Sequence, residues 1–388
     1  MLSIVIPTKD RHAELKHTLA RLAALGAHAF DPIGGAELIV VDNASATPVL
    51  VAQSPLPGMR VRVLRSERNL AAAARNLAAE DARGEWLLML DDDSSPLDAS
   101  FVEHLLSAPA EVAALAADIA LPGALSREAG GLPEVFVGCG VAVRAQAFHE
   151  CGGYDRSFGF YAEEYDLAAK LLLAGARVRH QPGFRVEHRK VTAGRDMNGI
   201  LRRLVRNNAV VAQRYAPDDE LDRMLAHTVD RYRAIAEREG ATAGYEVGLR
   251  ELNERLAAEP RTPMPAALWR RFTGEAAARV GAERLAAEGA RAAAIVERGK
   301  NDWAVERALR HADIEIVGER DDAARADVRV VGTLSPGPVL DALGRLSRGA
   351  TGDASAPPVV ALWSPSDDVG DGERRTASTE ADDFRRAG

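Results

Sequence analysis

The sequence predicts a parallel α/β fold for the first half of the chain and a second, smaller α/β unit near the C-terminus. In the first half, short runs of branched apolar residues alternate with segments of helical periodicity. A similar alternation returns after about residue 290. Alternating strands and helices are typical of parallel sheets, whose strands are buried on both faces. The 388 residues also exceed the size of one typical domain.

The expected strands of the first half end on polar residues. These strands are "LSIVIP" (2–7), "ELIVVD" (37–42), "VRVL" (61–64) and "EWLLML" (85–90). Ligands of parallel α/β sheets bind outside the carboxyl ends of the strands. Thr8, Asp42 and Asp91–Asp93 all follow such ends, so we expect a site there.

The pattern changes from about residue 135. "VFVGCGVAVR" alternates like a strand that passes close to a ligand, a helix begins within "AEEYDL", and "FRVEHRK" is a further strand. Helical periodicity dominates from residue 195 to about residue 289. The predicted segments are an α/β domain (1–215), a helical linker or extension (216–289), a small doubly wound α/β domain (290–364) and a disordered tail (365–388).

Composition narrows the function. The formal net charge of -8 argues against nucleic-acid binding, which usually needs a basic face. No apolar run reaches the length of a membrane span, and we expect no signal peptide. The 2 cysteines favour reduced thiols and a cytoplasmic protein. The small α/β unit has no G-x-G-x-x-G and no P-loop, so we expect a docking or dimerisation module and a possible homo-oligomer through this region.

The stretch "LLMLDDDSSP" places three adjacent carboxylates at the end of an apolar run. Asp91 and Asp93 are alternate residues, so they can share one face and hold a hard cation such as Mg²⁺. A solvated turn explains Asp and Ser equally well. The spacing alone leaves both interpretations open.

Five blocks in order decide between them, because together they resemble family 2 glycosyltransferases of the GT-A fold. The blocks are "SIVIPTKDR", "ELIVVDNAS", "RNLAAAARNLAAEDARGEWLLMLDDDS", "GGYDRSFGFYAEEYDLAAKLLLAG" and "FRVEHRKVTAG". They cover about residues 1–215. The resemblance implies a mostly parallel sheet flanked by helices, a nucleotide-sugar donor, a divalent cation (Mg²⁺ or Mn²⁺) and inversion at the anomeric carbon.

The same resemblance implies roles for individual residues. Pro7, Thr8 and Arg11 correspond to the first loop around the nucleoside, Asp42 to a residue that binds the nucleobase, and Arg75 to a residue that holds the nucleotide. A carboxylate at Asp42 suits uracil, so a UDP-sugar is favoured. Asp93 and His188 are the expected metal ligands, Asp91 a ribose or water-mediated contact, and Asp92 a contact to the donor sugar. Arg75 as a surface ion pair and His188 as a structural residue are the alternatives.

The expected catalytic base lies in "AEEYDL". Relatives usually carry Glu-Asp-x-Asp-Leu, so Glu164 occupies the base position with one extra methylene, and Asp166 is its rival. A helix N-terminus also favours acidic residues without any catalytic role, and for Glu163 and Asp166 we prefer that explanation.

Other functions are less favoured. A sugar-1-phosphate nucleotidylyltransferase would need a Gly-rich loop after the first strand, and "IPTKDR" has no glycine. The intact carboxylates argue against an inactive binding module. The expected acceptor is a small or carrier-bound metabolite, with cell-envelope glycan as the alternative.

Overall fold

The structure is a computed structural model that describes residues 1–51, 59–123, 126–128, 130–190, 196–318, 325–349 and 357–365. The tail predicted to be disordered lies, from residue 366 onward, outside the described residues.

An eight-stranded sheet organises the N-terminal part of the described chain, in the order β3-β2-β1-β4-β7-β6-β8-β5. The strands are β1 (Leu2–Thr8), β2 (Ala36–Asn43), β3 (Arg60–Ser66), β4 (Trp86–Leu90), β5 (Ser94–Pro96), β6 (Val112–Ala120), β7 (Gly140–Arg144) and β8 (Arg177–His188). β3, β2, β1 and β4 are parallel, whereas β7 and β5 run antiparallel to their neighbours. The sheet therefore confirms the predicted parallel half and adds a mixed half.

The sequence analysis did not identify β5 and β6. β5 has only three residues, and β6 is the Ala-rich run "VAALAADIA". Alanine favours helices and is depleted in strands, so the tertiary context of β6, between β7 and β8, overrides its local propensity.

Helices cover both faces of this sheet. They are α1 (His12–Ala24), η1 (Ala27–Ile33), η2 (Ala71–Ala73), α2 (Ala74–Asp81), α3 (Phe101–Ser107), α4 (Ala145–Glu150) and α5 (Glu163–Leu173). In α1, Leu15, Leu19 and Leu22 are buried, as their helical spacing indicates. Their contacts with β-strand residues form one of the buried apolar clusters.

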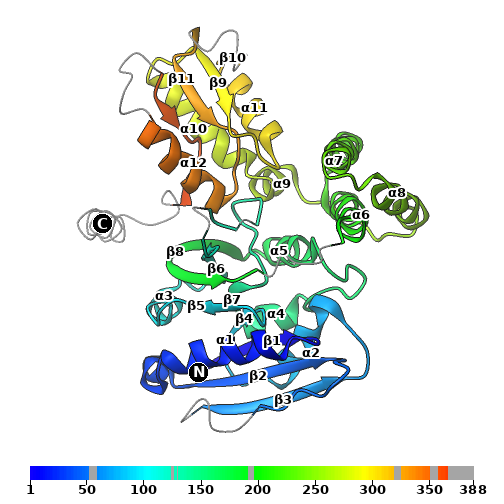
Figure 1. The fold of residues 1–388 in the computed structure, drawn as a ribbon. Coiled ribbons are helices and arrows are strands. Elements are labelled where there is room, and N and C mark those ends of the chain that lie inside the picture. The colour runs from blue at the N-terminus through cyan, green and yellow to red at the C-terminus, as the bar shows by residue number, and fades with distance from the viewer. Residues whose placement is uncertain are drawn as a thin grey trace.

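A helical arm follows, formed by α6 (Met197–Tyr215), α7 (Asp218–Arg238) and α8 (Thr242–Leu256). Figure 1 shows this arm beside the two sheets. α8 lies so close to α6 that a Cβ on Gly244 or Gly248 would be 2.1 or 2.4 Å from a carbonyl oxygen of α6. Small residues therefore set the spacing of these two helices.

The C-terminal α/β unit contains a four-stranded parallel sheet in the order β10-β9-β11-β12. Its elements are α9 (Ala266–Phe272), α10 (Glu275–Ala287), β9 (Ala292–Val296), α11 (Asp302–His311), β10 (Glu315–Val317), β11 (Val328–Val331), α12 (Pro336–Gly349) and β12 (Val359–Val360). The four strands agree with the sequence prediction. β10, which follows β9 in the chain, lies on one side of β9, and β11 and β12 lie on its other side. The strand order therefore reverses between β9 and β11.

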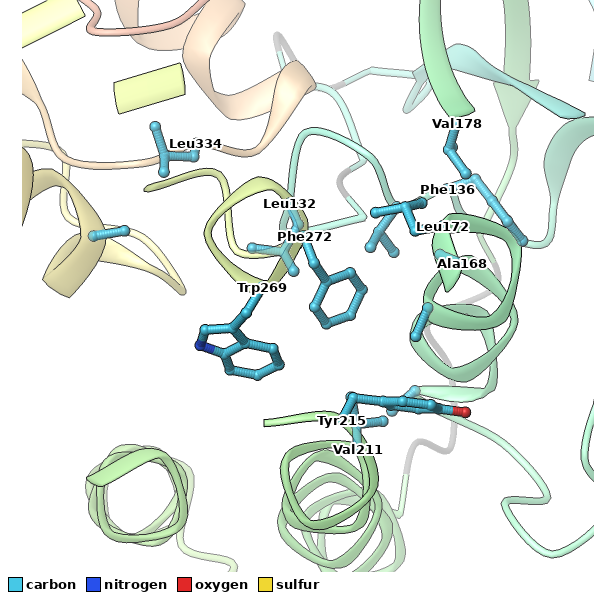
Figure 2. Close-up of a cluster of buried hydrophobic side chains, with 14 of the residues drawn as sticks. Leu132, Phe136, Ala168, Leu172, Val178, Val211, Tyr215, Trp269, Phe272 and Leu334 are labelled. Carbon is cyan, nitrogen blue, oxygen red and sulfur yellow. The ribbon is translucent and has the colours of Figure 1, made fainter. Parts of the chain in front are cut away.

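A shared apolar core joins the large domain to the C-terminal unit. Figure 2 shows Phe272 of α9 and Leu334 of the β11–α12 loop near Leu132 and Phe136 of the large domain, with α5 and α6 beside them. These side chains are all at most 3% exposed. The two parts therefore pack through a dry interface and not through a loose linker.

Candidate active site

A cavity of about 620 Å³ opens at the carboxyl ends of β1 and β4, where the sequence predicts a site. We call it the aspartate cavity. Its lining includes most of the predicted site residues, namely Pro7, Thr8, Arg11, Arg75, Asp91, Asp92, Asp93, Glu164 and His188. The loop after β1, the turn after β4, the start of α5 and the end of β8 all contribute.

The turn after β4 holds its three aspartates apart. Ser94 Oγ accepts a hydrogen bond from the Asp91 backbone N–H (2.8 Å) and donates one to the Cys139 carbonyl (2.7 Å). This anchors the turn to the residue before β7. The sequence motif "DDDS" thus includes the hydroxyl that shapes its own turn.

Asp92 is tied to the first loop. Thr8 Oγ1 donates to Asp92 Oδ2 at 2.7 Å, and Arg11 Nε lies 3.1 Å from Asp92 Oδ1. Burial raises the pKa of Asp92 to about 7, although Thr8 and Arg11 oppose the shift. Its oxygens face partners within the protein, which identifies Asp92 as an anchor of the first loop.

Asp93 and His188 meet because β5 pairs with β8, which places Ser94 opposite His188. His188 Nε2 lies 3.2 Å from Asp93 Oδ1, and His188 Nδ1 contacts Glu128. Burial lowers the pKa of His188, but the bonds to Asp93, Cys139 and Glu128 outweigh it and raise the pKa to about 12. Nδ1 is thus held by a carboxylate, as is usual for a metal-binding histidine, while Nε2 would have to release its proton to bind a cation.

The donor atoms suit a hard divalent cation. One carboxylate oxygen of Asp91, one nitrogen of His188 and the Cys139 sulfur lie within 4.8 Å of one another, and Asp93 adjoins His188. Carboxylate oxygen is a ligand of both Mn²⁺ and Mg²⁺, whereas imidazole nitrogen is more typical of transition metals and a thiol suits softer ions. Burial raises the pKa of Cys139 to about 12, so its thiol stays protonated and is the poorest of these donors.

Arg75 is buried, which excludes the surface ion pair that the sequence left open. It is 4% exposed and donates to the carbonyls of Leu90 (3.2 Å) and Gly138 (3.1 Å), besides an ion pair with Asp91. The guanidinium fixes the end of β4 to the loop that precedes β7. Part of the Arg75 side chain also lines the aspartate cavity.

Glu163 and Glu164 begin α5 at the other side of the aspartate cavity. Glu164 Oε1 accepts a hydrogen bond from Gly138 N–H at 3.3 Å, while Glu163 is 5% exposed and one of its buried oxygens has no partner among the described residues. Burial raises the pKa of both carboxyls, and the charge of Glu164 adds to the shift of Glu163. Perturbed carboxyls in a cleft are typical of acid–base sites.

The backbone before these glutamates is strained. Tyr161 and Ala162 have φ angles of 72° and 66°, a region that residues with a Cβ rarely occupy. Other such residues border the same cavity, including Ala71 (52°) and Lys190 (35°). Strain of this kind persists where surrounding structure enforces it, and it concentrates at functional sites.

Two predicted residues are not brought into the cavity. Asp42 accepts from the backbone N–H groups of Ser45 (2.9 Å) and Val49 (3.1 Å) and pairs with Arg65, so it shapes the loop after β2. Asp166 is 0% exposed and contacts Arg214 (2.7 Å) and Tyr215 (2.6 Å). Neither is among the residues that line the cavity.

A second cavity, of about 660 Å³, adjoins the first. We call it the interdomain cavity, because the large domain, α6 and the C-terminal unit all line it. Both cavities share Glu128, Val137, Tyr161 and Glu164. Sequence reasoning missed this cavity and also missed Glu128 and Lys190, whose side chains pair at 2.7 Å beside His188. Lys190 lies within the matched block "FRVEHRKVTAG", two residues after His188, and this position was the one available signal.

Comparison with known proteins shows what the N-terminal part of this domain is similar to. The family model of glycosyl transferase family 2 matches residues 3–121. An uncharacterised glycosyltransferase of Haemophilus influenzae is 28% identical over 200 residues, which cover 44% of this chain and 62% of that protein. The pre-mycofactocin glycosyltransferase of Mycobacterium tuberculosis is 27% identical over 219 residues, covering 50% of this chain and 44% of that protein. The chain thus spans less than two thirds of the length of these curated relatives.

Among solved structures, the mannosyltransferase PcManGT of Pyrobaculum calidifontis, in complex with GDP-Man and Mn²⁺, is 17% identical with a TM-score of 0.45. The alignment covers 80% of this chain and 85% of that chain. At this level of similarity, the donor and the metal of that protein are not assigned to this chain. Within the described ranges, no helix is both long and apolar enough to cross a membrane.

Proposed function

We propose that the chain transfers a sugar from a nucleotide donor to an acceptor hydroxyl, with inversion and with the help of a divalent cation. The match of the glycosyl transferase family 2 model to residues 3–121 supports this proposal. A UDP-sugar is the preferred donor. The observation that carries the proposal is the position of Glu164 at the junction of two cavities that also share Tyr161.

The aspartate cavity is proposed to hold the donor. Lys9, Arg11, Arg75 and Lys190 line it and can oppose the charge of a diphosphate. The carboxylates of Asp91 to Asp93 would repel that diphosphate in the absence of a cation. Asp93 and His188, with Asp91 close by, are the residues that would hold Mn²⁺ or Mg²⁺. When bound, the cation neutralises charge on the leaving diphosphate.

Glu164 is proposed as the catalytic base. Its carboxylate takes the proton of the acceptor hydroxyl while that oxygen forms a bond to the anomeric carbon. The bond from this carbon to the diphosphate oxygen breaks, and its electron pair leaves with the nucleoside diphosphate. One displacement of this kind inverts the anomeric centre. Glu128, the other carboxylate shared by the two cavities, is paired with Lys190 and His188 and is less available for this step.

Asp42 does not support a particular nucleobase in the donor, because its side chain faces the loop after β2. The donor must therefore be identified by experiment. A thermal-shift panel of UDP-, dTDP- and GDP-sugars, each with and without Mn²⁺, should give the largest shift for a UDP-sugar with Mn²⁺. Release of UDP from the same sugar should then require Mn²⁺. A panel without any cation-dependent shift would contradict the proposal.

The acceptor proposal remains a small or carrier-bound metabolite, with cell-envelope glycan as the second candidate. A cytoplasmic location is also proposed, and the free thiols of Cys139 and Cys151 are compatible with it.

A further inference from the structure

We propose that the interdomain cavity is the acceptor site and that the C-terminal α/β unit forms its outer wall, selecting a neutral, hydroxyl-rich acceptor such as a sugar or glycoside. This inference rests on the proposed glycosyl transfer. It adds a role for the loops after β9 and β11 and for α12, in a unit that the sequence assigned to docking or dimerisation.

The topology of the small sheet places its natural ligand position at this cavity. Ligands of open parallel sheets bind beyond the carboxyl ends of the strands, where the strand order reverses. In this sheet the order reverses between β9 and β11. The loops that follow these two strands carry Gly299 and Lys300, and Thr333 and Ser335, and both line the interdomain cavity.

These two loops are fixed to each other and to the large domain. Gly299 N–H donates to the Gly332 carbonyl at 2.9 Å, and a Cβ on Gly299 would lie 2.4 Å from Thr333. Ser335 Oγ accepts from Gly131 N–H of the large domain at 3.1 Å. The wall is therefore built in place and does not depend on a domain closure.

The charges that line the cavity largely pair with one another. Arg127 contacts Asp341 at 2.7 Å, and Arg345 contacts Glu297 at 3.1 Å. Arg298 pairs with two acidic residues of α11, and Glu128 with Lys190. Lys300 and Glu164 remain, and burial lowers the pKa of Lys300 well below its usual range and raises that of Glu164. Both shifts favour the neutral forms, so the cavity attracts neither anions nor cations strongly. This differs from the aspartate cavity, where three acidic side chains are adjacent.

The remaining polar groups suit hydroxyls. Lys300 Nζ donates to Asn208 Oδ1 at 2.6 Å and lies 3.6 Å from the centre of the Tyr165 ring. In the described part of the chain it makes no ion pair with a carboxylate, so the amine keeps hydrogen-bonding capacity for a ligand beyond its bond to Asn208. The volume of about 660 Å³ falls within the range of small-molecule sites. An acceptor held there by Lys300 would present a hydroxyl to Glu164.

The test uses the full chain with UDP and Mn²⁺ and three kinds of probe: the neutral disaccharides maltose and cellobiose, the anionic glucose 6-phosphate, and the apolar cyclohexanol. Binding is measured by saturation-transfer NMR. At least one disaccharide should bind best, and Lys300→Met should weaken its binding by roughly tenfold, because the hydrogen bond from Lys300 to the ligand is lost. The affinity for UDP with Mn²⁺ should not change. Lys16→Met, on the exposed face of α1, is the matched control and should behave like the wild type.

Each of the other outcomes contradicts one part of the proposal. Preference for glucose 6-phosphate or cyclohexanol contradicts the neutral class. Equal disaccharide binding by wild type and Lys300→Met contradicts the location. Absence of any probe binding while UDP binds contradicts the acceptor site. Loss of cation-dependent UDP binding in the wild type contradicts the proposed function instead. If Lys300→Met does not fold, Asn208→Ser in α6 tests the same position, because it alters the partner that holds Lys300.

Discussion

In both sheets, the carboxyl ends of parallel strands form an edge that lines one of the two adjoining cavities. The two edges differ in charge. At the edge of the large sheet, Asp91, Asp92 and Asp93 meet Arg11, Arg75 and His188 in a dense ionic network. At the edge of the small sheet, hydroxyls and glycines dominate, and the nearby charges pair off. The same topology therefore provides one edge suited to a charged diphosphate and one suited to neutral hydroxyls.

The two edges meet at Glu164, and its loss should have the largest effect. Glu164→Gln keeps the size and polarity of the side chain but cannot take a proton, so we expect the transfer rate to fall by about 10²–10⁴-fold. Affinity for UDP with Mn²⁺ should barely change. In the wild type, the raised pKa of Glu164 should move the acidic limb of the rate profile above the usual range of a glutamate. A rate within threefold of the wild type, on the order expected for a peripheral residue, would assign the base elsewhere.

Asp166 lies two residues after Glu164. Its substitution distinguishes a structural role from a catalytic one. It is fully buried against Arg214 and Tyr215, so Asp166→Asn should cost about 3–5 kcal/mol of unfolding free energy, since a buried charge loses its partner. Urea denaturation measures this. The rate per folded molecule should remain near that of the wild type. A stable but inactive Asp166→Asn variant would make Asp166 the base and Glu164 its neighbour.

Asp93 tests whether the ionic edge is a cation site. Asp93→Ala should weaken cation-dependent UDP binding by about 10–100-fold, in line with the loss of a metal ligand or its support. Isothermal titration with and without Mn²⁺ measures the difference. Asp42→Asn is the control: it should alter stability and leave the effect of Mn²⁺ intact. Equal cation dependence in Asp93→Ala and wild type would exclude Asp93 as a ligand.

The smallest effect concerns His180, which is buried in β8. Burial, and then the charge of Arg127, lower the pKa of His180 to about 3. The unfolded chain therefore binds a proton more readily than the native state, and stability is lost as pH falls from about 6.5 toward 3. At pH 5 this amounts to about 2 kcal/mol, from about 1.4 kcal/mol per pKa unit. His180→Gln should show a smaller drop in Tm between pH 7 and pH 5; an equal drop would contradict the assignment.

The sequence predicted the ionic edge far better than the neutral one. Asp91 to Asp93, Arg11 and Glu164 lie in motifs whose local context specifies them. The meeting of His188 with Asp93 depends on a pairing between β5 and β8, which the spacing along the chain does not encode. Lys300 and Thr333 belong to no motif, and they reach the cavity only because α9 and α10 pack the small sheet against the large domain. Asp42 and Asp166 do not line the aspartate cavity, because a motif gives a position but not the direction in which a side chain points.

The shared core around Phe272 and Leu334 has a consequence for how the protein is made. Leu132 and Phe136 emerge from the ribosome early, while Leu334 emerges some 200 residues later. Until then the apolar surface of the large domain remains exposed to water, and such surfaces favour aggregation. The chain should therefore unfold in one cooperative transition, and nascent or shortened forms should depend on chaperones.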